Sequence, residues 1–111
     1  MSGDEDDFAR RLAERYFEMW NTGDSSIASE IISADWVDHA HPEVHGPEGA
    51  ASAVEQIRAA RPDLRFTVDA VLGDDSQVAV VGSASGTRLI WLFQVENGYL
   101  AELRTYRDTS S

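Results

Sequence analysis

Apolar residues recur at intervals of three and four along the first part of the chain, the spacing of an amphipathic helix. This series consists of Phe8, Leu12, Tyr16, Met19 and Trp20, widened by Ala9, Ala13 and Phe17. Gly23 is placed to end the helix, and Asp24 or Ser26 can cap a second, short helix. That second helix is expected to bury Ile27, Ile31 and Ile32 and to end at Ser33-Ala34-Asp35.

A third helix is expected after a loop at residues 40–46, because Pro47 suits the first position of a helix and Pro62 closes it. Its buried stripe contains Ala50, Val54, Ile57 and the aliphatic stem of Arg58. A short strand, Asp35–His39, precedes that loop. Four further strands are predicted after the third helix, separated by turn residues: Leu64–Gly73, Gln77–Ser85, Thr87–Glu96 and Tyr99–Arg107.

This order predicts one α+β domain over residues 1–111, with three N-terminal helices packed on a strongly curved, mostly antiparallel sheet. The strand Thr87–Glu96 carries Leu89, Trp91, Phe93 and Val95 on one face and Ile90 and Leu92 on the other. A sheet with one wet face alternates apolar and polar residues, so both faces are expected to be covered. We therefore predict a homodimer through the convex face of the sheet.

Composition narrows the classes of function. The chain has 20 acidic and 9 basic residues and a net charge of −11, which disfavours nucleic-acid and anionic membrane partners. It lacks cysteine, which removes disulfides and thiolate chemistry. No apolar run is long enough to span a bilayer, and the first residues do not read as a signal peptide. A cytoplasmic location is expected.

The first candidate for chemistry is His39, at the end of the run Asp35-Trp36-Val37-Asp38-His39. Imidazole titrates nearest neutral pH and transfers protons readily. Successive side chains of a strand point to opposite faces, so Asp38 and His39 cannot both enter one cavity. If His39 faces inward, it is an acid–base group at the mouth of a pocket. The alternative is a structural histidine bonded to backbone.

Several short pieces together resemble the nuclear transport factor 2-like superfamily, and within it the SnoaL-like polyketide cyclases and ketosteroid isomerases. The matching pieces are Arg15-Tyr16…Asn21-Thr22-Gly23-Asp24, Trp36-Val37-Asp38-His39, Gly46-Pro47-Glu48-Gly49, Arg61-Pro62-Asp63-Leu64-Arg65-Phe66-Thr67-Val68, Gly86-Thr87 and Asn97-Gly98-Tyr99-Leu100-Ala101-Glu102…Asp108. The resemblance implies a cone-shaped barrel, a bent sheet wrapped around a long helix with an apolar cavity at its wide end.

The resemblance also suggests roles for three residues. Tyr16 falls where the isomerases keep an oxyanion-binding tyrosine, His39 where they keep a proton-shuttling aspartate, and Asp108 where the cyclases keep an acid–base aspartate. The chain departs from the pattern at Trp91 and Leu92, where the isomerases' second oxyanion acid has no counterpart. It departs again at Arg104, where cyclases commonly carry tryptophan, and in a shorter stretch after Gly86-Thr87.

The remaining candidates have a structural alternative each. Trp20, Trp36, Trp91 and Phe93 are expected to shape the cavity, although aromatic residues at this spacing also form plain cores. Arg104 either binds an anionic or enolate-like group or pairs with Glu102 at the surface. Asp108 is either an acid or a solvated residue near the C-terminus. His41 and His45, with His39 and Glu43, fit no common metal motif, so no metal is expected.

These observations predict a cofactor-independent acid–base enzyme acting on a small, hydrophobic, carbonyl-bearing molecule by isomerisation or ring closure; epoxide opening needs the same groups and a bound water. His39 moves the proton, Asp108 orients or assists it, and Tyr16 donates to the oxyanion. The alternative is a dimeric module of the same fold that binds a small hydrophobic molecule or a peptide without chemistry.

Overall fold

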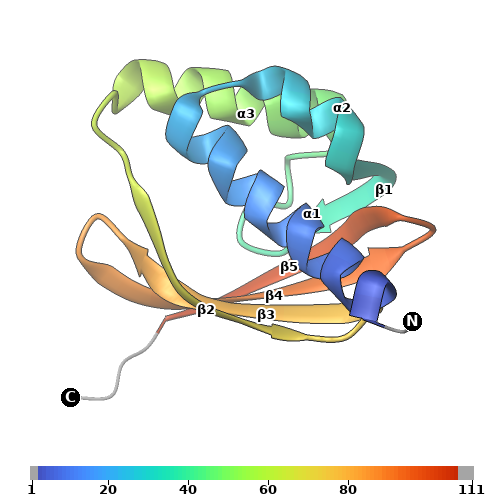
Figure 1. Ribbon diagram of the computed structural model, residues 1–111. Coiled ribbons are helices and arrows are strands. Elements are labelled where there is room, and N and C mark those ends of the chain that lie inside the picture. Colours follow the sequence, from blue (N-terminus) through green and yellow to red (C-terminus); the bar gives the residue numbers. More distant parts are fainter. Residues whose placement is uncertain (1–2, 108–111) are drawn as a thin grey trace.

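The computed structural model describes residues 3–107, in which helices lie over one face of a five-stranded sheet (Figure 1). The helical segments are α1 (Gly3–Thr22), the 3-10 turn η1 (Ser25–Ile27) leading into α2 (Ala28–Ile31), and α3 (Gly46–Ala60). The strands are β1 (Ile32–Asp38), β2 (Phe66–Gly73), β3 (Gln77–Ala84), β4 (Thr87–Glu96) and β5 (Tyr99–Arg107). The predicted α+β class, with three helices on a curved sheet, is confirmed.

The sheet has the order β1-β5-β4-β3-β2, and β1 runs parallel to β5 while the other neighbours are antiparallel. It curls toward the helices without closing, because β1 and β2 remain its two edges (Figure 1). The helices and the concave face of the sheet therefore enclose a space that is open along part of its perimeter. None of the helices in the described part of the chain is long and apolar enough to span a membrane.

The prediction was wrong about where β1 begins. Ile32 was assigned to the second helix, whereas it is extended, with φ −98° and ψ 129°, and pairs with Leu100 of β5. A β-branched side chain suits a pleated surface, and this pairing outweighs the helical spacing of the isoleucines. The strand ends at Asp38, so His39 lies just beyond it, in the turn that follows.

Aromatic rings form the centre of the core, between α1 and the sheet. Tyr16 contacts the rings of Phe17, Trp20, Trp36 and Phe93, with centroid separations of 5.1–6.4 Å. Most of these ring pairs are edge-to-face, an arrangement that stabilises beyond simple burial. Phe93 and Trp36 are almost completely buried, so this cluster fixes α1 against β4 and β1.

Two side chains tie the helices to the start of the sheet. Asn21 donates from Nδ2 to the Phe66 carbonyl at 2.9 Å and accepts from the Phe66 N–H at 2.7 Å, in the manner of a neighbouring strand. Arg58 donates to the carbonyls of Trp20 at 2.8 Å and Leu64 at 3.0 Å. These bonds join the end of α3 to the end of α1, and both helices to the segment that leads into β2.

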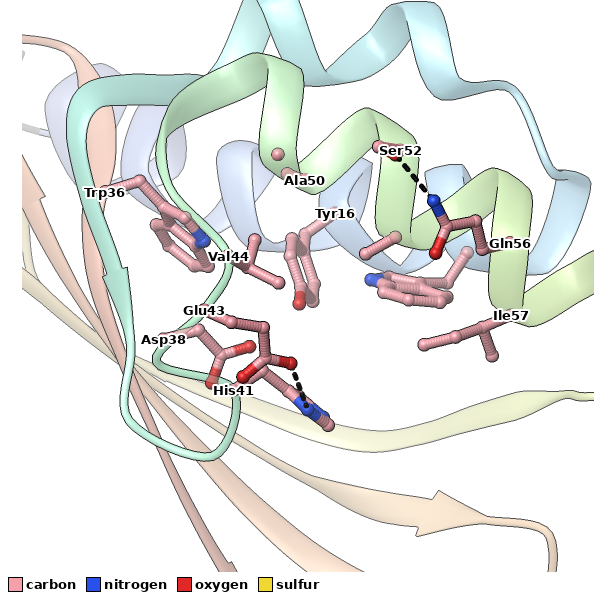
Figure 2. Close-up of a pocket in the computed structure, with 13 residues that line it drawn as sticks. Tyr16, Trp36, Asp38, His41, Glu43, Val44, Ala50, Ser52, Gln56 and Ile57 are labelled. Atoms are coloured by element: carbon pink, nitrogen blue, oxygen red, sulfur yellow. Dashed lines mark hydrogen bonds and ion pairs between the residues drawn. The ribbon is translucent and has the colours of Figure 1, made fainter.

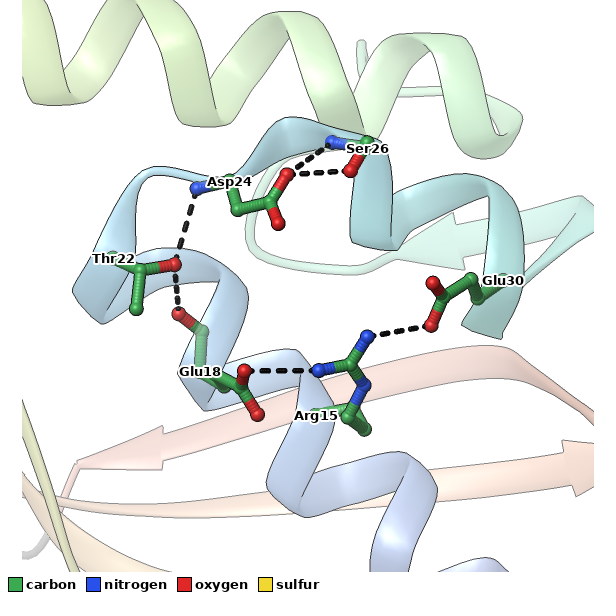
Figure 3. Close-up of polar contacts among 6 residues, drawn as sticks. All are labelled: Arg15, Glu18, Thr22, Asp24, Ser26 and Glu30. Carbon is green, nitrogen blue, oxygen red and sulfur yellow. Dashed lines mark hydrogen bonds and ion pairs between the residues drawn. The ribbon is translucent and has the colours of Figure 1, made fainter.

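A separate polar group links α1 and α2 on the outside of the molecule (Figure 3). Arg15 bridges Glu18 at 2.9 Å and Glu30 at 2.6 Å, and Asp24 caps η1 by accepting from the Ser26 N–H. The ion pairs are exposed, and exposed pairs contribute little to stability. The Asp24 cap contributes more to stability, because it accepts a hydrogen bond from an N–H group that the helix leaves without a partner.

The register of the strands sorts the side chains onto two faces. Val80, Trp91 and Thr105 lie side by side, as do Val78, Phe93 and Leu103, and these rows face the helices. Two rows face the other way, and they are Ala70-Val81-Ile90-Tyr106 and Leu72-Ala79-Leu92-Arg104. Trp91, Leu103 and Thr105 of the first pair of rows line the cavity, and the other members of these rows are buried in the core. The second pair of rows forms a convex face that is partly exposed.

Candidate functional site

A cavity of about 340 Å³ lies between α1, α3 and the end of β1, and we call it the helix-side chamber (Figure 2). Most of its wall is apolar, with contributions from Trp20, Trp36, Val44, Ala50 and Ile57. The polar groups that reach it include Tyr16 from α1, Asp38 from β1, and His41 and Glu43 from the loop before α3. An apolar wall with a few placed polar groups is typical of small-molecule sites.

A second space of about 550 Å³ adjoins the first and is bounded by β3, β4 and β5, so we call it the sheet-side chamber. It shares five lining residues with the helix-side chamber, which are Tyr16, Trp20, Asp38, His41 and Ile57. The two chambers therefore meet at Tyr16 and Asp38. A ligand that spans both chambers would lie against this shared wall.

Tyr16 lies at this junction because it occupies the cavity-facing side of α1. Its side chain is buried, and Figure 2 shows its hydroxyl directed toward the region of Asp38. Burial raises the pKa of the phenol well above 10, the negative charge of Asp38 raises it further, and the Trp20 indole acts weakly in the opposite direction. The phenol therefore stays protonated and can donate a hydrogen bond at any physiological pH.

Asp38 faces the cavity because of its partner in the sheet. It is paired with Leu103 of β5, and Leu103 lines the sheet-side chamber. Burial raises the pKa of Asp38, while a hydrogen bond from the Ala40 N–H, at 3.0 Å, and the nearby His41 oppose the increase. A carboxylate that loses part of its hydration is a stronger base than one in water.

His39 lies outside both chambers, and its placement differs from the expectation that it faces inward. Its Nε2 contacts Glu102 Oε2, and Glu102 in turn accepts from Arg104 at 3.3 Å. Glu102 is paired with Val37, which points away from the cavity, and the side chains of His39, Glu102 and Arg104 are partly exposed. The alternation that the sequence indicated is real, but it directs Asp38 inward and His39 outward.

Arg104 also lies on the outer side of the sheet, since its neighbours Leu103 and Thr105 line the sheet-side chamber and Arg104 does not. Phe93 is completely buried and belongs to the core rather than to a chamber wall. Trp20, Trp36 and Trp91 each line a chamber. Asp108 lies outside the described residues. Of the predicted catalytic set, only Tyr16 lines the cavity in residues 3–107.

Trp20 adds a feature that the sequence did not reveal. Its Nε1 is buried and lies near enough to the Tyr16 hydroxyl to oppose the rise in the pKa of that phenol, but it meets hydrogen-bond geometry with no atom in the described part of the chain. Leaving a buried N–H without an acceptor costs roughly 1–3 kcal/mol. Because Trp20 lines both chambers, an oxygen atom of a ligand near Tyr16 is a natural acceptor for this donor.

The residues that sequence reasoning undervalued are Asp38, His41 and Glu43. Asp38 was recognised as the neighbour of His39, but the sequence did not show which of these two side chains faces the cavity. His41 and Glu43 lie 3.8 Å apart at the edge of the helix-side chamber and are exposed. Over residues 3–107, no three His, Asp or Glu side chains gather closely enough to hold a metal ion.

Comparison with known families identifies the fold. A model of the SnoaL-like domain matches residues 13–108, which is most of the chain. The chain belongs to the SnoaL-like domain family. The predicted resemblance to the nuclear transport factor 2-like superfamily is thereby confirmed. No curated protein sequence gives a significant match.

Solved structures agree on the fold at low sequence identity. TsrD from Streptomyces laurentii superposes on the SnoaL-like domain with a TM-score of 0.74 at 20% identity, covering 91% of this chain and 88% of TsrD. IdmH from Streptomyces antibioticus, described as a candidate polyketide cyclase, gives 0.70 at 22% identity, with 88% and 90% covered. A SnoaL-like candidate isomerase from Agrobacterium tumefaciens gives 0.74 at 15%, with 91% and 97% covered. At these identities the likeness establishes the fold and leaves the reaction open.

Proposed function

We propose that this SnoaL-like protein is a cofactor-independent acid–base enzyme that isomerises or cyclises a small apolar molecule bearing a carbonyl group. The observation that carries the proposal is the meeting of Asp38 and Tyr16 at the junction of two mostly apolar chambers. One of these groups is suited to accept a proton, and the other is suited to donate a hydrogen bond. Enolisation of a carbonyl compound needs both at once.

Asp38 takes the part that the sequence suggested for His39. Its carboxylate removes a proton from the carbon next to the carbonyl group, and the bonding electrons move to the carbonyl oxygen to give an enolate. Returning the proton to the far carbon of a carbon–carbon double bond that is conjugated with the enolate completes an isomerisation. Attack of the enolate carbon on a second carbonyl group instead closes a ring and leaves an alkoxide, which takes the proton back from Asp38. Burial raises the pKa of Asp38 toward the operating pH, which is the change that a general base requires.

Tyr16 and Trp20 act on the other end of the reaction. The Tyr16 hydroxyl donates to the carbonyl oxygen as negative charge develops, and the Trp20 N–H supplies a second donor for the same oxygen. Donors that are fixed in an apolar cavity stabilise such charge without reorganising. Removing one donor of this kind typically slows a reaction by about 10²–10³-fold.

The test uses 2-tetralone, a bicyclic ketone with acidic hydrogens next to its carbonyl group. In D₂O at neutral pH, the native protein is expected to accelerate exchange of these hydrogens, as followed by NMR. Asp38→Asn removes the base while retaining an acceptor for the Ala40 N–H, so exchange should fall to the uncatalysed rate. Tyr16→Phe should slow exchange without preventing binding.

The result also separates an enzyme from a binding module. A protein that binds 2-tetralone tightly, as measured by calorimetry, but exchanges none of its hydrogens would contradict the catalytic proposal. In that case the apolar wall, including Trp36 and Ile57, should dominate the affinity. Equal exchange rates in native protein and Asp38→Asn would likewise remove Asp38 from the mechanism.

We further propose that the protein works as a homodimer through the convex face of the sheet. Two adjacent rows of this face are rich in apolar residues, and Leu72, Ile90 and Tyr106 are 59%, 36% and 49% exposed. Exposed apolar surface of this extent is typical of an interaction site. Sedimentation should give twice the chain mass at micromolar concentration, and Ile90→Asp should give the mass of the monomer. A native monomer would overturn this proposal.

A further inference from the structure

The two chambers differ in the polar groups that line them. The helix-side chamber is bordered by two carboxylates, Asp38 and Glu43, and by His41. Beyond the residues that both share, the sheet-side chamber has a different polar set, namely Arg61, Ser85, Thr87, Thr105 and Arg107. Every one of these side chains can donate a hydrogen bond, and none of them is a carboxylate.

The charged groups that line the sheet-side chamber differ from the composition of the chain as a whole. With 20 acidic and 9 basic residues, a wall chosen at random would carry more carboxylates than guanidinium groups. The two arginines instead come from separate elements, since Arg61 follows α3 and Arg107 ends β5. Both arginines are exposed where they line the chamber, and a positive patch on a strongly negative protein attracts an anion locally.

The fold places these donors along one side of the sheet-side chamber. Arg61 donates to Ser85 Oγ at 3.4 Å, which connects the end of α3 to the turn between β3 and β4. Thr105 is paired with Trp91, and Arg107 is paired with Leu89, so both sit on the cavity face of β5 beside apolar residues. The chamber thus combines an apolar floor with a donor-rich end.

We propose that the sheet-side chamber binds a carboxylate, so that the substrate is an elongated apolar carbonyl compound with a carboxylate at one end. Arg61 and Arg107 attract the carboxylate, and Ser85, Thr87 and Thr105 complete its hydrogen bonds. The apolar body lies along Leu89 and Trp91, which brings the carbonyl group to Tyr16. This inference rests on the proposed function for the position of the carbonyl group and adds the substrate class.

The charge of Asp38 fixes the direction in which such a molecule binds. A carboxylate next to Asp38 and Glu43 would be repelled, whereas among residues 3–107 the same group at the far end of the sheet-side chamber meets only donors. The substrate therefore enters with its carboxylate toward Arg61 and its reactive carbon toward Asp38. Only one orientation places the carbon to be deprotonated near the base.

The experiment compares two ligands of the same shape, 2-naphthylacetate and 2-naphthylacetamide, by titration calorimetry on the full chain at low salt. The native protein should bind the carboxylate at least about fivefold more tightly than the amide, and added salt should reduce this preference. Arg61→Gln should weaken binding of the carboxylate by about three- to tenfold and leave binding of the amide unchanged. Arg61→Gln together with Arg107→Gln should abolish the preference.

The matched control is Arg65→Gln, which removes the same charge from an exposed residue that lines neither chamber. It should leave both affinities at their native values. A native protein without preference for the carboxylate would overturn the proposal, and so would an Arg61→Gln variant that weakens both ligands equally. A preference that Arg65→Gln reduces as much as Arg61→Gln would show a general charge effect and would also overturn it.

The outcome is separable from that of the proposed function. Failure of the carboxylate preference with normal exchange of 2-tetralone removes the anion subsite and leaves the acid–base chemistry of Asp38 intact. A clear preference without any exchange supports the subsite and contradicts catalysis. If neither naphthyl compound binds at millimolar concentration, the sheet-side chamber is not a ligand site and this proposal fails.

Discussion

Asp38 is paired across the sheet with Leu103, and this pairing directs its carboxylate into the cavity. His39 follows one residue later, donates its N–H to the Leu103 carbonyl at 3.0 Å, and carries its ring to Glu102 on the other side. A single register of two parallel strands therefore determines which of two adjacent proton-transfer groups meets a ligand.

Substitutions at these two neighbours should differ in how strongly they slow the reaction. Asp38→Asn is expected to reduce exchange of 2-tetralone hydrogens by at least about 100-fold, the typical contribution of a positioned base. His39→Gln should change the rate by less than about threefold, because its side chain contacts Glu102 and not the cavity. Rates from NMR in D₂O decide the matter. A large loss in His39→Gln with a small loss in Asp38→Asn would reverse the assignment.

The raised pKa of Asp38 determines how the exchange rate should depend on pH. The rate of exchange should rise with pH as Asp38 ionises and level off above its pKa, which lies above the usual 3.8 because of burial. The rising limb should disappear in Asp38→Asn. A rate profile that is flat from pH 4 to pH 8 would show that no carboxylate of raised pKa is responsible.

The same pKa shift predicts an effect on stability. The folded protein binds the Asp38 proton more tightly than the unfolded chain, so Asp38 lowers stability as pH rises from 3.8 through its raised pKa. Asp38→Asn removes this cost and retains an acceptor for Ala40. Its Tm should therefore exceed the native Tm at pH 7, and the difference should vanish below pH 3.8. A lower Tm at pH 7 would contradict this reasoning.

Gly82 should tolerate no side chain. A Cβ atom at this position would lie 1.9 Å from the Thr67 carbonyl oxygen, where β2 passes β3 next to the irregular register between Val68 and Ala70. Gly82→Ala is expected to lower the free energy of unfolding by about 1–3 kcal/mol, as overpacking does. Gly86→Ala is the comparison. A Cβ atom at Gly86 would meet no atom within 4 Å, but the backbone there has φ +86°. Urea denaturation of both variants measures the two effects.

Asn21 should be sensitive to the loss of either of its hydrogen bonds. Asn21→Asp retains the acceptor for the Phe66 N–H but removes the donor to the Phe66 carbonyl, whereas Asn21→Leu removes both. Each partly buried bond contributes about 1 kcal/mol, so Asn21→Leu should lower stability by about 2 kcal/mol. Ser52→Ala, in the exposed pair with Gln56, should change stability little. Equal denaturation midpoints for native protein and Asn21→Leu would contradict this role.

The sequence predicted the elements well where their periodicity was long. The spacing from Phe8 to Trp20 defined α1, and the turns at residues 73–76, 85–86 and 96–98 separated β2, β3, β4 and β5. Ile32 was misassigned to the second helix, because the spacing of the three isoleucines is the same whether the last one ends a helix or begins a strand. Only its pairing with Leu100, which is 68 residues away, made it a strand residue.

The sequence by itself determined that this chain has an α+β fold, and its short motifs placed it in the SnoaL-like family. The elements follow from local periodicity and turn residues, which act over a few positions, whereas the family follows from the resemblance of short motifs in a fixed order. The tertiary structure alone decided that Asp38 and not His39 enters the cavity, that Arg104 faces outward, and that Arg61 and Arg107 share one chamber. Each of these depends on the register of strands distant in sequence, and a shift of one residue would exchange the two faces.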